Sequence, residues 1–142
     1  MGSETPPGSR YGRIWRGLTQ RLAGVLETAR DQTAAAPQLL DELLRHPHAE
    51  RLRVIQSRHE FRTAPLCAAL LEKSYELLAR DAEEAERLAL LAITLLPELK
   101  APGIGPMLLA ELAARAWCLV ADARRRRGIH DDAEEAFAEA AE

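Results

Sequence analysis

The sequence has few of the residues that build β-structure or a disulfide framework. Aromatic residues make up only 4% of the 142 residues, with three valines and five isoleucines. Because β-branched and aromatic residues favour strands, this scarcity argues against a β-sandwich or barrel. The two cysteines, Cys67 and Cys118, form neither a CxxC motif nor a disulfide framework. We expect both to be small buried thiols of a reduced, cytoplasmic protein.

Long apolar runs and a strong net charge are also absent. No run reaches the ~18 apolar residues that a membrane-spanning helix needs, and no signal-peptide core is visible. The formal net charge of −3 excludes a uniformly basic nucleic-acid binder. Residues 1–62 carry 10 Lys and Arg against 7 Asp and Glu, whereas residues 63–142 carry 9 against 15. The first part of the chain is therefore basic and the rest is acidic.

Alanine and leucine are the most frequent residues in the sequence. The chain has 26 alanines and 23 leucines, and both residues favour helices. Apolar residues recur at three- and four-residue steps from about Arg10 onward, which is the spacing of amphipathic helices. We therefore predict an all-α fold. Residues 1–9 are predicted to be a flexible tail, residues 10–62 to form N-terminal capping helices, and residues 63–142 to form two helical hairpins.

The segment from Arg10 to about Ala29 is predicted to be an amphipathic helix. Its apolar stripe consists of Tyr11, Ile14, Trp15, Leu18, Leu22, Val25, Leu26 and Ala29. Arginines lie mostly off that stripe, at Arg10, Arg13, Arg16 and Arg21. The favoured interpretation packs the stripe against the body of the protein. The alternative is a basic amphipathic helix that docks on a membrane or an acidic partner.

Prolines and turn residues divide the remaining helices. Pro37 suits the first turn of a short helix, and Thr63 is a good N-cap for the helix that Pro65 begins. A short break at 80–81 predicts an antiparallel hairpin, and a linker at 98–106 separates it from a second hairpin. The predicted helices span residues 37–45, 47–58, 65–79, 82–96, 107–127 and 131 to the end.

The last hairpin carries large, small and turn residues at fixed spacing. They are Trp117, Ala121, Gly128, Ala133, Phe137 and Ala140. This pattern resembles the tetratricopeptide repeat, a helix–turn–helix unit of about 34 residues. The first hairpin resembles a degenerate copy, since it keeps Ala85, Ala92 and Pro97 at the spacing of the family. It has Ala69, Lys73 and Arg80 where the family has Trp, a small residue and Gly.

The resemblance covers about residues 66–142 and implies a short right-handed array of helical hairpins. Such arrays bind a peptide or protein on the concave face, which the first helix of each repeat lines. By spacing, the site residues would be Cys67, Leu70, Ser74, Leu77, Arg115, Cys118, Asp122 and Arg125. An array this short leaves an end face open, so we expect the natural protein to continue or another chain to cover that face. The favoured function is a non-catalytic interaction module in a larger bacterial regulatory or scaffolding protein.

Two alternatives to the interaction module remain open. The run Arg124–Arg127 and the N-terminal arginines could contact nucleic-acid phosphates, although cations at a helix C-terminus are also favoured by the helix dipole. The last helix could instead mediate self-assembly into a structural protein. No phosphate-binding loop, nucleophile motif or metal-ligand spacing is present, so no catalytic residue, metal or cofactor is predicted.

Overall fold

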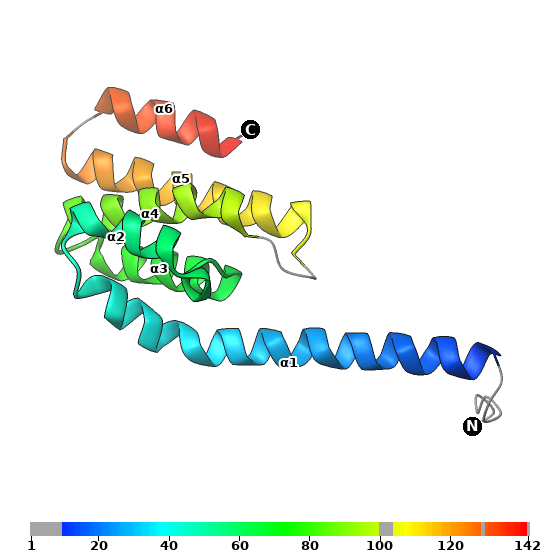
Figure 1. Ribbon diagram of the computed structural model, residues 1–142. Coiled ribbons are helices and arrows are strands. Elements are labelled where there is room, and N and C mark those ends of the chain that lie inside the picture. The colour runs from blue at the N-terminus through cyan, green and yellow to red at the C-terminus, as the bar shows by residue number, and fades with distance from the viewer. Residues whose placement is uncertain (1–9, 100–103, 129, 142) are drawn as a thin grey trace. The chain divides into compact units, whose positions relative to one another are not determined.

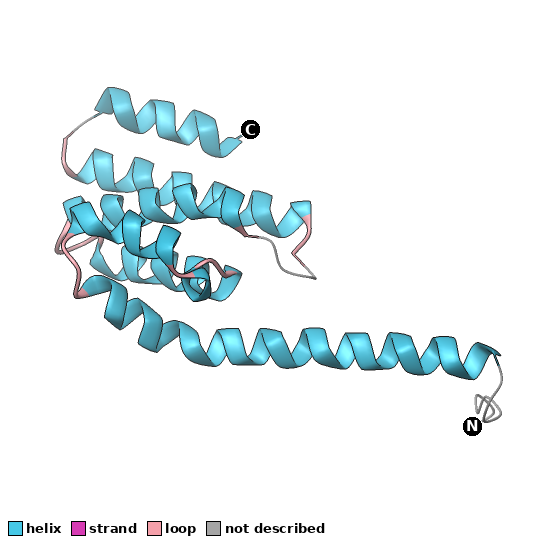
Figure 2. Ribbon diagram, in the orientation of Figure 1, coloured by secondary structure: helices cyan, strands magenta, loops and turns pink. Residues whose placement is uncertain are grey.

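The computed structural model of the protein describes residues 10–99, 104–128 and 130–141. Within these ranges the chain forms six α-helices and two short 3-10 helices, and no strand (Figures 1 and 2). The predicted all-α class is therefore confirmed. The tail predicted at residues 1–9 lies outside the described residues.

The chain divides into two compact units, Met1–Asp31 and Gln32–Glu142. The boundary falls within α1 (Arg10–Leu44), a helix of 35 residues that contains Pro37. The prediction of two separate helices over this stretch is therefore wrong. Alanines precede Pro37 and leucines follow it. Because both are strong helix formers, the helix continues past the one N–H donor that proline removes.

In the first unit, the described residues belong to the N-terminal part of α1. Its large apolar side chains are exposed, with fractions of 54% for Ile14, 68% for Trp15, 48% for Leu18, 63% for Leu22 and 55% for Leu26. That this stripe packs against the body of the protein stays a prediction, because it concerns a contact between the two units. Periodicity reports only that a helix is amphipathic, and a partner or a lipid surface can satisfy that pattern as well as a core.

The second unit contains the rest of α1 and five further helices (Figure 1). They are α2 (His48–Ser57), α3 (Ala64–Leu77), α4 (Ala82–Leu95), α5 (Pro106–Arg126) and α6 (His130–Ala141), with 3-10 turns η1 (His59–Phe61) and η2 (Leu96–Glu98). These bounds agree closely with the helices predicted beyond residue 46. None of the helices in the described ranges combines the length and apolar character needed to cross a membrane.

Capping residues explain where several of these helices begin and end. The Thr63 hydroxyl accepts a hydrogen bond from the Leu66 N–H at 3.3 Å, which confirms the predicted N-cap of α3. The Asp81 carboxylate accepts one from the Glu84 N–H at 3.2 Å and caps α4. After α5 ends, Gly128 has a φ of 79°. Glycine tolerates this left-handed conformation, so it is well suited to the turn before α6.

The core lies where helices adjacent in the chain pack on one another. The contacts run from α3 to α4, from α4 to α5 and from α5 to α6, and α3 also contacts α5. Leu70, Leu88 and Ala92 are fully buried between them. Small alanines let the helix axes approach closely, while leucines fill the remaining space. Leu43 and Phe61 join the same core from α1 and η1.

Candidate functional site

A single row of side chains along α5 carries four of the predicted site residues. Arg115, Cys118, Asp122 and Arg125 follow one another at steps of three and four, which places them on one face of the helix. Arg115, Cys118 and Arg125 are exposed, and the Asp122 side chain is 30% exposed. We call these four residues the α5 row. The opposite side of α5 is buried in the core, so the row has a rigid support.

The four site residues predicted on α3 lie in a different environment. Cys67, Leu70 and Ser74 are fully buried, and Leu77 is partly buried against the core. The Ser74 hydroxyl donates a hydrogen bond to the Ala85 carbonyl oxygen at 2.6 Å, so this face of α3 is packed against α4. These three buried side chains do not present a surface to a partner in this structure.

The two cysteines differ in environment. Burial raises the pKa of the Cys67 thiol to about 12, and the positive charge of Arg115 acts in the opposite direction. α3 and α5, which carry Cys67 and Arg115, contact each other. Cys118 is exposed. The prediction of two buried thiols is therefore wrong for Cys118, because its position in the α5 row directs it away from the core.

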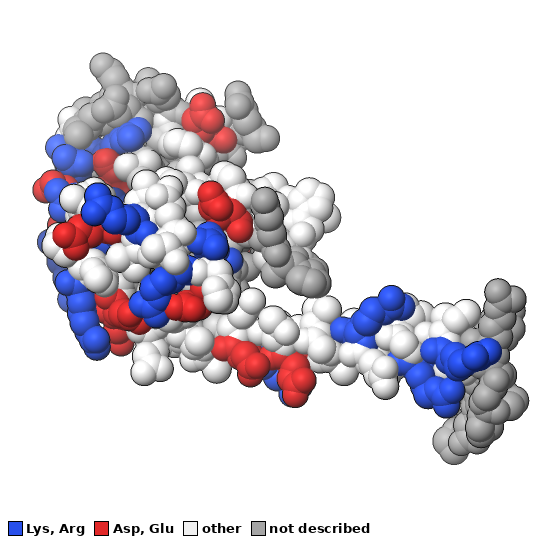
Figure 3. All heavy atoms as spheres, in the orientation of Figure 1, with Lys and Arg blue, Asp and Glu red and all other residues white. Residues whose placement is uncertain are grey.

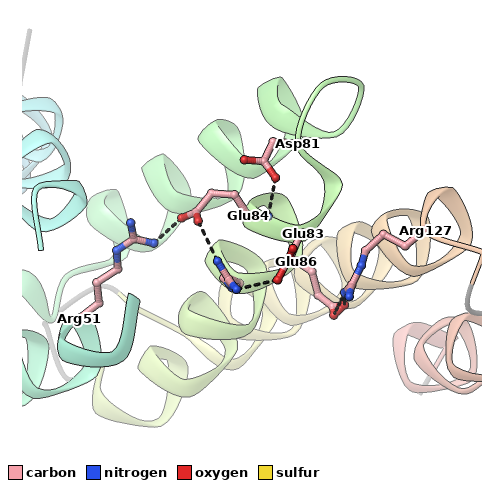
Figure 4. Close-up of polar contacts among 7 residues, drawn as sticks. Arg51, Asp81, Glu83, Glu84, Glu86 and Arg127 are labelled. Carbon is pink, nitrogen blue, oxygen red and sulfur yellow. Dashed lines mark hydrogen bonds and ion pairs between the residues drawn. The ribbon is translucent and has the colours of Figure 1, made fainter. Parts of the chain in front are cut away.

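Two arginines of the run Arg124–Arg127 bind a carboxylate on α4. Arg127 Nη1 donates hydrogen bonds to Glu86 Oε1 at 2.8 Å and to Oε2 at 3.3 Å (Figure 4). Arg124 Nε lies 3.6 Å from Glu86 Oε2. The Glu86 side chain is only 11% exposed. This cluster therefore joins α4 to the C-terminal end of α5 by charge-assisted contacts.

The other two arginines of the run, Arg125 and Arg126, contact Asp122 of the α5 row. Arg125 Nη2 donates to Asp122 Oδ1 at 2.5 Å, and Arg126 Nε lies 3.8 Å from the same oxygen. The guanidinium carbon of Arg125 also lies 5.4 Å from the centroid of the Phe137 ring, a cation–π contact between α5 and α6. Phe137, noted in the sequence only for its repeat spacing, thus extends the α5 row.

A second charged network connects α2 to the start of α4. Arg51 pairs with Glu84, and its Nε donates to the His46 carbonyl oxygen at 3.2 Å. Arg87 lies 2.6 Å from Glu83 and 3.7 Å from Glu84 (Figure 4). Glu83 and Glu84 lie in the first turn of α4, where the helix dipole favours acidic side chains. The sequence gives no signal for Arg51, because 33 residues separate it from Glu84.

A third network lies near the C-terminal end of α1. Arg58 Nε donates to Glu60 Oε1 at 2.6 Å, and the same guanidinium pairs with Glu42 and lies 4.8 Å from the Phe61 ring centroid. The hydrogen bond from Arg58 lowers the pKa of Glu42 below its ordinary value of 4.5. Basic and acidic side chains are accordingly intermixed over the face of the second unit seen in Figure 3.

The described residues also form a small hollow, which is lined by residues of α1 and α3, among them Leu40, Asp41, Glu72 and Lys73. No cluster of three His, Cys, Asp or Glu in the described ranges could hold a metal ion. No family model, curated protein or solved structure matches the chain.

Proposed function

We propose that the chain is a non-catalytic protein-interaction module that binds a peptide or protein segment along the α5 row. In this proposal α3–α4 and α5–α6 are two hairpins like those of tetratricopeptide repeats, and the helices before them form an N-terminal cap. The order of helix contacts supports the proposal, since two stacked hairpins bring α3 against both α4 and α5. The left-handed Gly128 between α5 and α6 fits the turn position of such a hairpin.

The observation that carries the proposal is the composition of the α5 row. An exposed thiol and a carboxylate lie between two arginines, Arg115 and Arg125, on a helix whose other face is buried. Arg125 is engaged by Asp122 and Phe137, so Arg115 is the cation better placed to bind an acidic group of a partner. A guanidinium binds a carboxylate through two parallel hydrogen bonds, which gives orientation as well as affinity.

The contacts of Arg124–Arg127 weigh against the nucleic-acid alternative. Each of these arginines lies within 4.0 Å of Glu86 or Asp122. A phosphate would therefore have to displace a carboxylate that already neutralises the guanidinium charge. The acidic balance of residues 63–142, with 15 Asp and Glu against 9 Lys and Arg, opposes polyanion binding further.

Selection from a displayed peptide library tests the proposal. We expect the wild type to enrich peptides that share an acidic position, and Arg115→Glu/Arg125→Glu to lose at least about tenfold in affinity for them. Arg53→Glu/Arg80→Glu is the matched control, because it reverses two exposed arginines on α2 and at the α3–α4 turn. It should bind as the wild type does.

Two results would contradict the proposed site. One is enrichment of peptides that bind the α5-row variant as tightly as the wild type. The other is tight binding of single-stranded nucleic acid with a steep log–log dependence on salt, which would favour the nucleic-acid alternative.

A further inference from the structure

The N-terminal part of α1 carries charge of one sign beside its exposed apolar stripe. Residues 10–26 include four arginines and no Asp or Glu. Arg13, Arg16 and Arg21 are exposed in the structure. Figure 3 shows the basic side chains gathered on this part of the helix. The intermixed acids that accompany arginines in the second unit are absent from the described residues of this segment.

The apolar side chains beside these arginines form a continuous surface. Ile14, Leu18, Leu22 and Leu26 follow one another at steps of four, and Trp15 widens the face. Scattered exposed apolar residues, such as Met107 on α5 and Tyr75 on α3, are ordinary in folded proteins. A stripe of five large apolar side chains on one helix face instead marks an interaction surface.

We propose that residues 10–26 form a docking helix for anionic membrane surfaces. The apolar stripe would enter the boundary between headgroups and acyl chains, with the helix lying in the plane of the membrane. The indole of Trp15, which is 68% exposed, has the apolar body and polar edge that suit this boundary. Arg13, Arg16 and Arg21 would face the lipid phosphates.

Charge complementarity favours an anionic lipid surface as the occupant. Such a surface presents negative charge along the whole segment, whereas a binding groove on a protein must match the arginines one by one. Gly17 leaves a shallow hollow on the helix between Arg13 and Arg21, which Ile14 and Gln20 also line. A Cβ added at Gly17 would meet nothing within 4 Å. The helix surface between Arg13 and Arg21 is therefore open at Gly17.

Sedimentation of the full chain with vesicles tests the proposal. We expect binding to phosphatidylglycerol vesicles, which weakens as salt is raised, and little binding to phosphatidylcholine vesicles. Arg13→Gln and Arg21→Gln should each lower the affinity about fivefold. Leu18→Asp/Leu22→Asp should lower it at least about a hundredfold. Met107→Asp/Tyr75→Asp, which changes exposed apolar residues of the second unit, should bind as the wild type does.

Fluorescence separates insertion from simple charge attraction. In Trp117→Phe, Trp15 is the only remaining tryptophan, and its emission should shift to the blue on phosphatidylglycerol vesicles. Absence of wild-type binding, an unshifted Trp15, or unchanged binding of Leu18→Asp/Leu22→Asp would each overturn the proposal. So would a dimer in vesicle-free light scattering that this double variant abolishes, because the stripe would then be covered by a second copy.

Discussion

Arg127 donates two hydrogen bonds to the carboxylate of Glu86, from 41 residues further along the chain, at 2.8 and 3.3 Å. Arg124 adds a third contact at 3.6 Å. Two positive charges thus converge on one nearly buried carboxylate between α4 and α5. Such a carboxylate is costly to leave in the interior without its partners, and its partners are costly to leave without it.

Replacing Glu86 should therefore destabilise the second unit. We expect Glu86→Ala to lower the free energy of unfolding by about 2 kcal/mol, because Arg124 and Arg127 lose their partner. Glu83→Ala is the matched control on the same helix. Its side chain is 56% exposed, so the loss should stay below about 0.5 kcal/mol. Urea denaturation followed by circular dichroism measures both, and equal losses would contradict the role of Glu86.

Arg51 should contribute more to the free energy of unfolding than its neighbour Arg53. Arg51 is 8% exposed and contacts both Glu84 and the His46 carbonyl. We expect Arg51→Ala to cost about 2 kcal/mol of unfolding free energy, since it leaves the Glu84 carboxylate without its partner from α2. Arg53→Ala, at an exposed position of the same helix, should change it by less than about 0.5 kcal/mol. Thermal denaturation of both variants distinguishes these outcomes.

The two thiols should differ sharply in reactivity. Burial raises the pKa of Cys67 to about 12, so its thiol stays protonated at neutral pH, whereas Cys118 is exposed. The thiolate is the nucleophile, and we expect a thiol reagent to modify one cysteine in the folded protein and two in denaturant. Cys118→Ser should abolish the reaction of the folded protein. Rapid modification of this variant would mean that Cys67 is accessible.

The raised pKa of Cys67 also has a consequence at high pH. Its folded pKa lies above the ordinary value of 9.0, so its protonated form is the one that folding favours. The stability that this thiol contributes is present below pH 9 and is lost as the pH rises beyond it. Cys67→Ala should therefore show a weaker loss of melting temperature between pH 9 and pH 11 than the wild type.

The stability that the contact between Arg58 and Glu42 contributes should be lost at acidic pH. The hydrogen bond from Arg58 lowers the pKa of Glu42 below 4.5, so folding favours the ionised form. The stability from this contact is present above the unfolded pKa and is lost as the pH falls through the folded pKa. Melting temperatures of the wild type and Glu42→Gln should differ at neutral pH and converge in acid. A constant difference across this range would contradict the assignment.

Gly128 should tolerate a side chain poorly although space is available. A Cβ there would meet nothing within 4 Å, but its φ of 79° is strained for any other residue. We expect Gly128→Ala to destabilise the α5–α6 hairpin by about 1 kcal/mol. Gly24 is helical and equally open, so Gly24→Ala should instead raise helicity. Thermal denaturation should show a lower melting temperature for Gly128→Ala. Circular dichroism should show a stronger helical signal for Gly24→Ala.

Features encoded by neighbouring residues could be predicted from the sequence. The N-cap at Thr63, the break after α3 and the glycine turn at Gly128 depend on backbone chemistry within a few residues. The helix start predicted at Pro37 is wrong, although its cause is also local. Proline favours the first turn of a helix, yet strong helix formers on both sides carry α1 through it.

Features that depend on distant residues could not be predicted. The periodicity of α3 places Cys67 and Ser74 on the same face of the helix. It does not indicate whether that face packs against α4 or is exposed to solvent. The spacing along α5 places Arg115, Cys118, Asp122 and Arg125 on one face of the helix, which follows from helix geometry alone. The partners of Glu86 and Arg51 come from helices far along the chain, and a single sequence has no pattern that pairs them.

The hydrogen bond from Ser74 to the Ala85 carbonyl sets the axial alignment of the first hairpin. The Ser74 hydroxyl is fully buried, and a buried hydroxyl is costly when it lacks an acceptor. Its bond to Ala85 therefore favours the observed stacking height of α3 on α4, the two helices that α5 also contacts.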